Sequence, residues 1–263
     1  MGYLEGVAPR WIAGGLLVLL LVAAEVAARL GRRRTPPASP ELRRLIDTVQ
    51  AAVLALLGLL LAFTFSMAAE RYETRRVLVL REANAIGTAW LRAGGLPDPT
   101  AGEERARLRA YVDVRLAFYA AGEDQERLDA ALWSAEDLQA ALWSTAMEEA
   151  RRAPQAIPLG LLLASLNEVI DLHEERVTAM QAHVPGEILI MLMFVALIGI
   201  GSVGYSYGLA GHRHHAASAV LGLLVAGIVH VILGLDEPRA GLIAVSQQSM
   251  MDLRDTLDRL DRR

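Results

Sequence analysis

The feature that most constrains this chain is an uncharged, apolar run from Thr48 to Ala69 that passes directly into the charged segment Glu70 to Arg76. No glycine or proline stands at the junction, so we expect one helix to continue from the first segment into the second. The apolar run is long enough to cross a hydrocarbon core about 30 Å thick. The pattern predicts a helix that spans a bilayer and extends into water. Such a helix carries something through the membrane or couples the membrane to a domain outside it.

Three further runs are long enough to span a bilayer. The chain is 54% hydrophobic with a positive mean hydropathy, which is typical of a membrane protein. Its remainder is rich in Ala, Leu, Glu and Arg and poor in β-branched and aromatic residues, a composition that favours helices. We therefore predict an all-α membrane protein with four transmembrane helices and a helical soluble domain between helices two and three. The expected spans are Trp11–Leu30, Asp47–Ala69, Glu187–Tyr207 and Ala216–Leu235.

The expected domain boundaries follow from these spans. We predict a first transmembrane helix pair (1–69), a helical soluble domain (70–186), a second transmembrane helix pair (187–235) and a C-terminal amphipathic tail (236–263). Gly31 to Arg44, with three prolines and five arginines, reads as an exposed turn. Within the tail, Met251–Leu260 has the pattern of an amphipathic helix that docks on the soluble domain or on a neighbouring subunit. The helix of the second span is expected to continue to about Leu91. Three further soluble helices are expected at about 101–121, 124–152 and 158–182.

Several classes of function find no support in the sequence. There is no cysteine, which excludes disulfides and thiolate metal sites. No nucleophile motif or phosphate-binding loop is present, and the arginines alternate with acids instead of forming a nucleic-acid patch. We therefore expect no catalytic residues, no enzyme activity, no cofactor, no metal site and no nucleic-acid partner. The group His212 to His215 could bind a metal or sense pH, but a short solvated loop is the better interpretation. Asp236-Glu237 supplies too few oxygens for calcium.

Two stretches carry a family resemblance. GLLLAFTFSMAAERYETRRVLVLREANAIGTAW (Gly58 to Trp90) resembles the second membrane helix of bacterial bestrophins, in which an apolar pore-lining run ends in an Arg-aromatic pair. HEERVTAMQAHVPGEI (His173 to Ile188) is similar to the link that precedes their third membrane helix. The resemblance implies a bestrophin-like homo-oligomer, a ring of five subunits, with an ion path lined by the second helix. Its expected substrate is chloride or another small anion, although some bacterial relatives pass cations.

The resemblance also places a pore neck. Bestrophins ring a hydrophobic constriction with residues at i, i+4 and i+8 before the Arg-aromatic pair, and these positions correspond to Ala55, Leu59 and Phe63. The three residues share one helix face within about 80°, and a ring of such faces closes an ion path by dewetting. Ala55 is smaller than the residue usual there. The alternative is a stripe that faces lipid or packs against another helix, as in any leucine-rich span.

Charged residues follow the neck where the second helix leaves the membrane. We expect Glu70, Arg71 and Arg75 to lie at the pore exit, beside the neighbouring Glu73 and Arg76. Rings of acidic side chains favour cations and rings of basic side chains favour anions, and both signs occur here. The alternative is an ordinary helix surface on which these charges form i,i+3 and i,i+4 ion pairs.

Two ionisable residues lie inside expected spans and are functional candidates for that reason. Glu25 stands four residues before Arg29, which favours an ion pair near the membrane surface. For His230, we expect a neutral imidazole that is hydrogen-bonded to a neighbouring helix. If either faced an internal cavity, a proton-coupled carrier would be the alternative. Glycines at three- and four-residue spacings between Gly199 and Gly211 predict a close helix approach.

Orientation and function each keep a rival interpretation. Basic residues near the span ends number about eight on the side of the soluble domain and six on the other, a small difference under the positive-inside rule. The resemblance places the soluble domain and both termini in the cytoplasm of a multi-pass bacterial inner membrane protein, with membrane lipids, small inorganic ions and further copies of the chain as partners. The rival function is a non-conducting scaffold or sensor whose helical domain and tail bind partner proteins.

Overall fold

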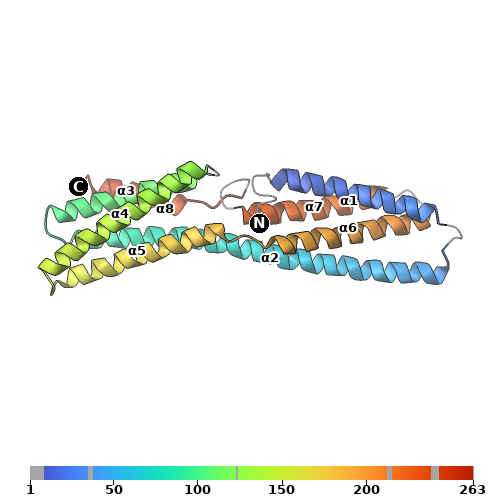
Figure 1. Cartoon of the computed structure of the whole chain (residues 1–263), viewed down its shortest axis with the longest axis horizontal. Coiled ribbons are helices and arrows are strands. Elements are labelled where there is room, and N and C mark those ends of the chain that lie inside the picture. The colour runs from blue at the N-terminus through green and yellow to red at the C-terminus, as the bar shows by residue number, and fades with distance from the viewer. Residues whose placement is uncertain (1–8, 35–37, 123, 212–214, 238–242, 263) are drawn as a thin grey trace. The chain divides into compact units, whose positions relative to one another are not determined.

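The computed structural model describes residues 9–34, 38–122, 124–211, 215–237 and 243–262, and over these ranges all regular structure is helical (Figure 1). This confirms the predicted all-α fold. The helices are α1 (Pro9–Arg32), α2 (Pro40–Ala93), α3 (Thr100–Ala120), α4 (Gln125–Arg152), α5 (Ile157–Gln181), α6 (Gly186–Leu209), α7 (His215–Asp236) and α8 (Gln248–Leu260).

Local sequence signals explain several helix ends. Ser39 caps α2, because its Oγ accepts a hydrogen bond from the Leu42 N–H at 3.3 Å, and Pro40 occupies the first turn that suits proline. The Gly94-Gly95 pair follows the last residue of α2, as expected of a helix stop. Asp124 caps α4 by accepting from the Arg127 N–H. The connector between α1 and α2 is shorter than the predicted Gly31–Arg44, because α1 extends to Arg32 and α2 begins at Pro40.

The chain divides into two compact units. The first, the membrane unit, contains α1, α2 as far as Arg71, α6 and α7. The second, the soluble unit, contains α2 from Tyr72 onward, α3, α4, α5 and α8. Helix α2 is unbroken from one to the other, which confirms the expected continuation of the second span into the soluble domain. Within the described residues, four helical segments are long and apolar enough to cross a membrane.

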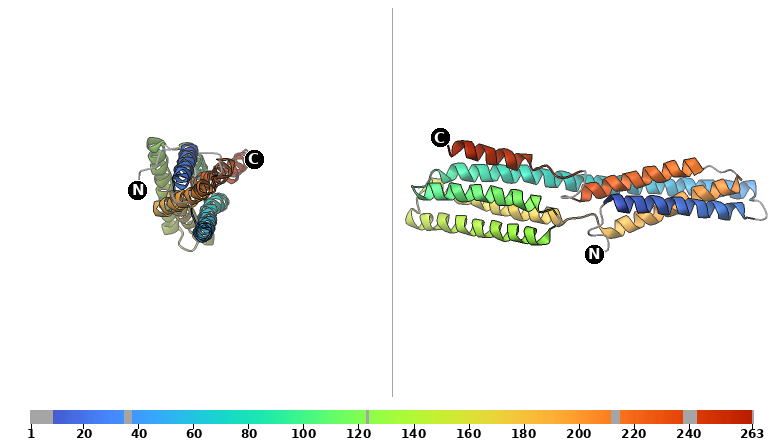
Figure 2. Two further views of the ribbon diagram at one scale, coloured as in Figure 1. Left: turned by 90° about the vertical axis from the view of Figure 1, so that its right-hand side faces the viewer. Right: turned by 90° about the horizontal axis from the view of Figure 1, so that it is seen from above.

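The part of the C-terminal tail from Ala244 onward belongs to the soluble unit. Helix α8 packs against α3, and the side chain of Arg109 forms an ion pair with Asp258. The right-hand view of Figure 2 shows α8, in dark red, running along the soluble segment of α2. Leu253 lies against Gly87 of α2, and Met250 and Leu257 are buried in the core. Of the two docking partners that the amphipathic pattern predicted, the soluble domain and a neighbouring subunit, the single chain shows contact with the first.

The soluble unit encloses one large apolar core to which every helix of the unit contributes. Long apolar side chains line the inward stripes of α2, α3, α4 and α5, and the tail covers them. Burial of this area is the main stabilising term of the unit. The core includes Leu78, Val79, Ile86, Trp90, Leu108, Tyr111, Val112, Leu142, Leu162, Leu166, Val169, Leu172, Val245, Met250 and Leu257.

Close approach of backbones holds the membrane unit together. Helix α1 packs against both α6 and α7, and these helices run side by side in Figure 1. A Cβ atom placed on Gly204 would overlap the carbonyl of Ala24, and one on Gly208 would overlap the carbonyl of Ala28. Small residues therefore meet across the α1–α6 contact, as the glycine spacing predicted.

We expect Gly204→Val to destabilise the membrane unit by about 1–3 kcal/mol, because the new side chain must push α1 away from α6. Thermal unfolding of the purified protein in detergent measures this effect. Gly201→Val is the matched control, since a Cβ at Gly201 meets no atom within 4 Å. Equal melting temperatures for the two variants would contradict the predicted contact.

Candidate functional site

The predicted neck residues lie together on an outward face of α2 in the membrane unit. Ala55 is exposed, and Leu59 and Phe63 are 52% and 63% exposed. The opposite face of the helix is buried, with Leu57 and Thr64 each 2% exposed. The single chain thus leaves an apolar face uncovered, and in a spanning helix such a face meets lipid, another subunit or a pore.

Helix α6 covers part of the buried face of α2. A Cβ placed on Gly199 would lie 3.2 Å from the Leu54 side chain, and the Ser206 hydroxyl donates a hydrogen bond to Oε1 of Gln50 at 2.8 Å. These contacts fix the rotation of α2 about its own axis. The neck residues consequently point away from α6.

The charges after the neck differ in their environments. Glu70 is exposed, whereas Arg71 is half-buried and its Nε has no hydrogen-bond partner. Arg76 donates two hydrogen bonds to the Glu73 carboxylate, at 2.7 and 2.8 Å, so these two charges offset each other on the surface. The predicted i,i+3 pairing is therefore present at Glu73 and Arg76. Glu70 carries an exposed negative charge beside them.

Arg75 does not share the exposed position expected of a pore-exit charge. Its side chain is 2% exposed, and its Nε and Nη2 donate to the carbonyls of Ala179 and Ala182 at 2.9 and 2.6 Å. These carbonyls lie at the C-terminal end of α5, where backbone acceptors lack helical partners and a positive charge is favoured. Arg75 therefore caps α5 and presents no exposed charge on the single chain.

Of the two ionisable residues inside the expected spans, Glu25 makes its expected contact and His230 does not make its expected contact through Nδ1. Glu25 accepts from Arg29 Nε at 2.7 Å and from Arg32 at 3.3 Å, which confirms the predicted ion pair. His230 is partly buried, and its Nδ1 makes no hydrogen bond, so that nitrogen does not form the expected interhelical bond. His212 and His214 lie outside the described residues. Among the described residues, no group of three His, Asp or Glu side chains can hold a metal ion.

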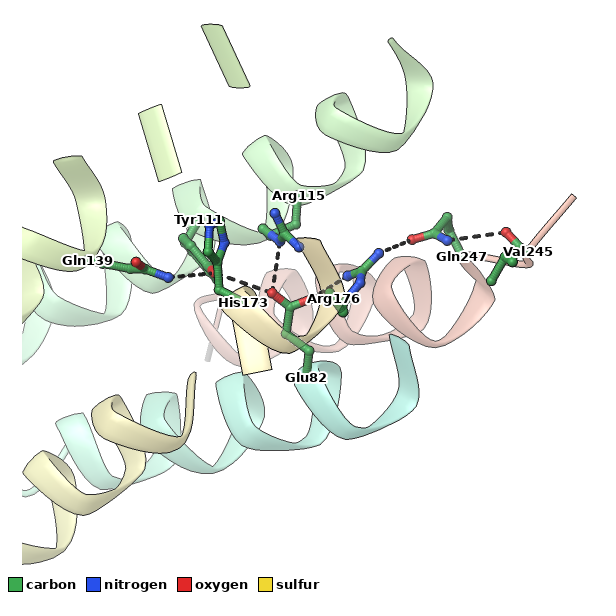
Figure 3. A network of polar contacts seen from close by, with 8 residues as sticks. All are labelled: Glu82, Tyr111, Arg115, Gln139, His173, Arg176, Val245 and Gln247. Atoms are coloured by element: carbon green, nitrogen blue, oxygen red, sulfur yellow. Dashed lines mark hydrogen bonds and ion pairs between the residues drawn. The ribbon is translucent and has the colours of Figure 1, made fainter. Parts of the chain in front are cut away.

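A buried polar network, which sequence reasoning missed, lies in the middle of the soluble unit (Figure 3). Glu82 of α2 is its centre and is 0% exposed. Oε1 of Glu82 accepts from Arg115 Nε of α3 at 2.8 Å, and Oε2 accepts from Arg176 Nη1 of α5. The Tyr111 hydroxyl lies 3.2 Å from Oε1 of the same carboxylate. One carboxylate thus ties together three helices.

The network continues outward in two directions. On one side, Gln139 of α4 donates to the Tyr111 hydroxyl at 3.0 Å, and His173 Nδ1 lies 3.2 Å from that hydroxyl. On the other side, Arg176 Nη2 donates to Oε1 of Gln247 at 2.9 Å, and Gln247 donates in turn to the Val245 carbonyl. The network therefore reaches all the helices of the soluble unit except α8, which begins directly after Gln247.

Burial and charge shift the ionisation of this network in opposing ways. Burial raises the pKa of Glu82, but the charges of Arg115 and Arg176 lower it more, so the pKa lies below its ordinary value and the carboxylate stays ionised. Burial raises the pKa of Tyr111, which stays neutral. Burial, together with the charge of Arg115, lowers the pKa of His173 to about 4.

These shifts predict that the soluble unit loses stability in mild acid. His173 has a pKa of about 4 in the folded protein and an ordinary value of 6.5. The unfolded chain therefore binds the proton first, and stability falls as the pH drops from about 6.5 to about 4. Glu82, with its lowered pKa, adds to the loss at the acid end. Melting temperatures from pH 7.5 to 4.5 measure the effect, and His173→Gln should flatten the curve. An unchanged slope in this variant would contradict the assignment to His173.

One sequence signal marks the network in retrospect. Glu82 stands between Val79 and Ile86 on the apolar stripe of α2, and Arg115 stands between Val112 and Phe118 on that of α3. A charge at a core position of a helix is expected only where it has a buried partner. The partner's identity requires the tertiary structure.

The fold and these sites define the class: a multi-span helical membrane protein with a helical unit between its second and third spans. The model of the bestrophin-like domain family matches residues 17–250. The chain therefore belongs to the bestrophin-like family, as the two resembling stretches predicted.

Solved structures share the fold. A single-residue variant of the bacterial bestrophin homolog from Klebsiella pneumoniae matches with a TM-score of 0.69 and 14% identity, covering 95% of this chain and 99% of that chain. A second variant matches with a TM-score of 0.70 and 13% identity, covering 95% and 98%. The homolog solved by zinc phasing matches with a TM-score of 0.64 and 14% identity, covering 92% and 96%. No curated protein matches the chain.

Proposed function

We propose that this protein is an ion channel formed by a ring of identical subunits, five by analogy with the family, in the inner membrane of a bacterium. Small inorganic ions, with chloride or another small anion as the expected substrate, pass through a hydrophobic neck lined by Ala55, Leu59 and Phe63 of each subunit. The soluble unit faces the cytoplasm.

The uncovered apolar face of α2 is the observation that supports this proposal most directly. Leu59 and Phe63 are more than half exposed on the single chain, while the opposite face of the same helix is packed. One copy cannot enclose a path, so a ring is part of the mechanism. In such a ring, apolar side chains at the narrowest point control ion passage by excluding or admitting water.

Single-cysteine labelling tests the proposal, because the protein contains no cysteine of its own. Leu59→Cys in a pore should react with a charged, water-soluble thiol reagent and lose ion flux in liposomes. A non-conducting scaffold predicts no flux for the wild type under any pH or ion gradient. A cysteine that stays unreactive in a conducting protein would place the path elsewhere.

The exposed charge at Glu70 should influence which ions pass. In a ring, five copies of Glu70 attract cations and repel anions. We therefore expect Glu70→Gln to raise the permeability of chloride relative to sodium about threefold, since loss of each negative charge lowers the barrier to anions. Reversal potentials under a salt gradient measure this ratio. Glu126→Gln is the control, because it removes an exposed acid from the first turn of α4, and it should change the permeability ratio less. Equal changes of the ratio in the two variants would contradict the placement of Glu70 at the pore exit.

A further inference from the structure

The buried network of the soluble unit holds more positive than negative charge. Arg115 is 0% exposed and Arg176 is 2% exposed, and the carboxylate between them belongs to Glu82. The guanidinium of arginine stays charged in proteins. The other groups that face this site, Tyr111 and His173, are neutral and supply no negative charge. One positive charge is therefore left uncompensated inside the fold.

The uncompensated charge is accompanied by free donors. Nη1 and Nη2 of Arg115 are buried and make no hydrogen bond to the protein, although its Nε is bound to Glu82. Nε of Arg176 is also buried without an acceptor. A buried donor that lacks an acceptor costs about 1–3 kcal/mol, and more when it is charged. In Figure 3 only one nitrogen of Arg115, its Nε, is joined to the Glu82 carboxylate by a dashed line.

The burial of Arg115 excludes a large ligand. Its side chain is 0% exposed, and the ring centroid of Phe118, itself 2% exposed, lies 5.1 Å from the guanidinium carbon. An anion that binds here loses its water shell and gains two parallel N–H donors and an aromatic neighbour. A small monovalent inorganic anion fits these conditions, because it has the opposite charge, accepts several hydrogen bonds and carries no bulky group.

We propose that the soluble unit binds one small monovalent inorganic anion, chloride in the cell, at the free Nη1 and Nη2 atoms of Arg115. The bound anion neutralises the excess charge of the network and stabilises the packing of α2, α3, α5 and the Gln247 segment. The site lies wholly within the soluble unit, so it does not depend on whether the assembled protein conducts ions.

Crystals of the full-length protein grown in sodium bromide test the site directly. Bromide replaces chloride and scatters anomalously, so we expect an anomalous peak within hydrogen-bonding distance of Nη1 and Nη2 of Arg115. A fully occupied water molecule there, or no density, would overturn the proposal. This measurement uses the wild-type protein and does not depend on how any variant folds.

Thermal unfolding in matched salts provides the solution test. Replacement of gluconate by chloride at constant ionic strength should raise the melting temperature of the soluble unit by about 2–4 °C, because chloride binds the folded state. Arg115→Gln leaves Arg176 and Glu82 as a balanced pair and should abolish this dependence. Arg127→Gln removes an equal charge from an exposed position on α4 and should preserve it. A melting temperature insensitive to chloride in the wild type, or equal chloride effects in both variants, would refute the site.

Discussion

Ion flux through the assembled protein is expected to rise about tenfold when Phe63 is replaced by alanine, and to rise less when Leu59 is replaced. Phe63 is the largest of the three proposed neck residues and is 63% exposed on the single chain. In the proposed neck, its loss should widen the constriction and admit water, which would lower the barrier to ion passage. A tenfold increase corresponds to a barrier lower by about 1.4 kcal/mol. Flux from liposomes that contain equal amounts of wild-type and variant protein measures the change.

Phe65→Ala is the matched control for this prediction. Phe65 lies on the same helix and is 43% exposed, but two residues of helix turn it well over 90° from Phe63. It should therefore leave flux near the wild-type level. Equal increases of flux in the two variants would indicate a general loosening of the membrane unit. An unchanged flux in Phe63→Ala would contradict the assignment of Phe63 to the neck.

The second large effect is expected at Glu82. Glu82→Ala removes the carboxylate that joins Arg115 to Arg176 and leaves two buried guanidinium groups without their anionic partner. Removal of one member of a buried ion pair costs about 3–5 kcal/mol. We therefore expect the soluble unit to unfold at a much lower temperature. Trp90, which is 3% exposed in the core of this unit, reports the transition by fluorescence.

Glu175→Ala provides the comparison for Glu82. Glu175 forms an exposed ion pair with Arg81 at 3.4 Å, with both side chains at least half exposed. Such pairs contribute about 1 kcal/mol or less, because water screens the charges. Similar losses of stability in the two variants would show that the Glu82 network does not hold the helices together.

Much of the architecture could be predicted from local pattern. Apolar runs of membrane length located four spans, because the bilayer interior admits few charges over that distance. The absence of a helix breaker after Ala69 predicted the continuation of α2, and the Gly94-Gly95 pair predicted its end. The glycine spacing in α6 anticipated the contact with α1. Each of these signals is a property of neighbouring residues in the chain.

The sites were predictable to a smaller extent. Family resemblance selected Ala55, Leu59 and Phe63, whereas their exposure depends on the packing of α6 against the opposite face of α2. Arg75 looks like its neighbours in the sequence, yet it is buried because the end of α5 supplies backbone acceptors. A charged residue's role depends on which distant groups reach it, and helical periodicity contains no information about those groups.

The sequence by itself determined the helices, the four spans, the continuous second helix and the family. Only the tertiary structure decided which charges are buried and how they are paired. Glu82, Arg115 and Arg176 lie on three helices far apart in the chain, and their interaction exists only because packing of those helices excludes water. Apolar periodicity specifies which face of a helix turns inward, whereas the partners of a buried charge are specified by the distances between helices after they have packed.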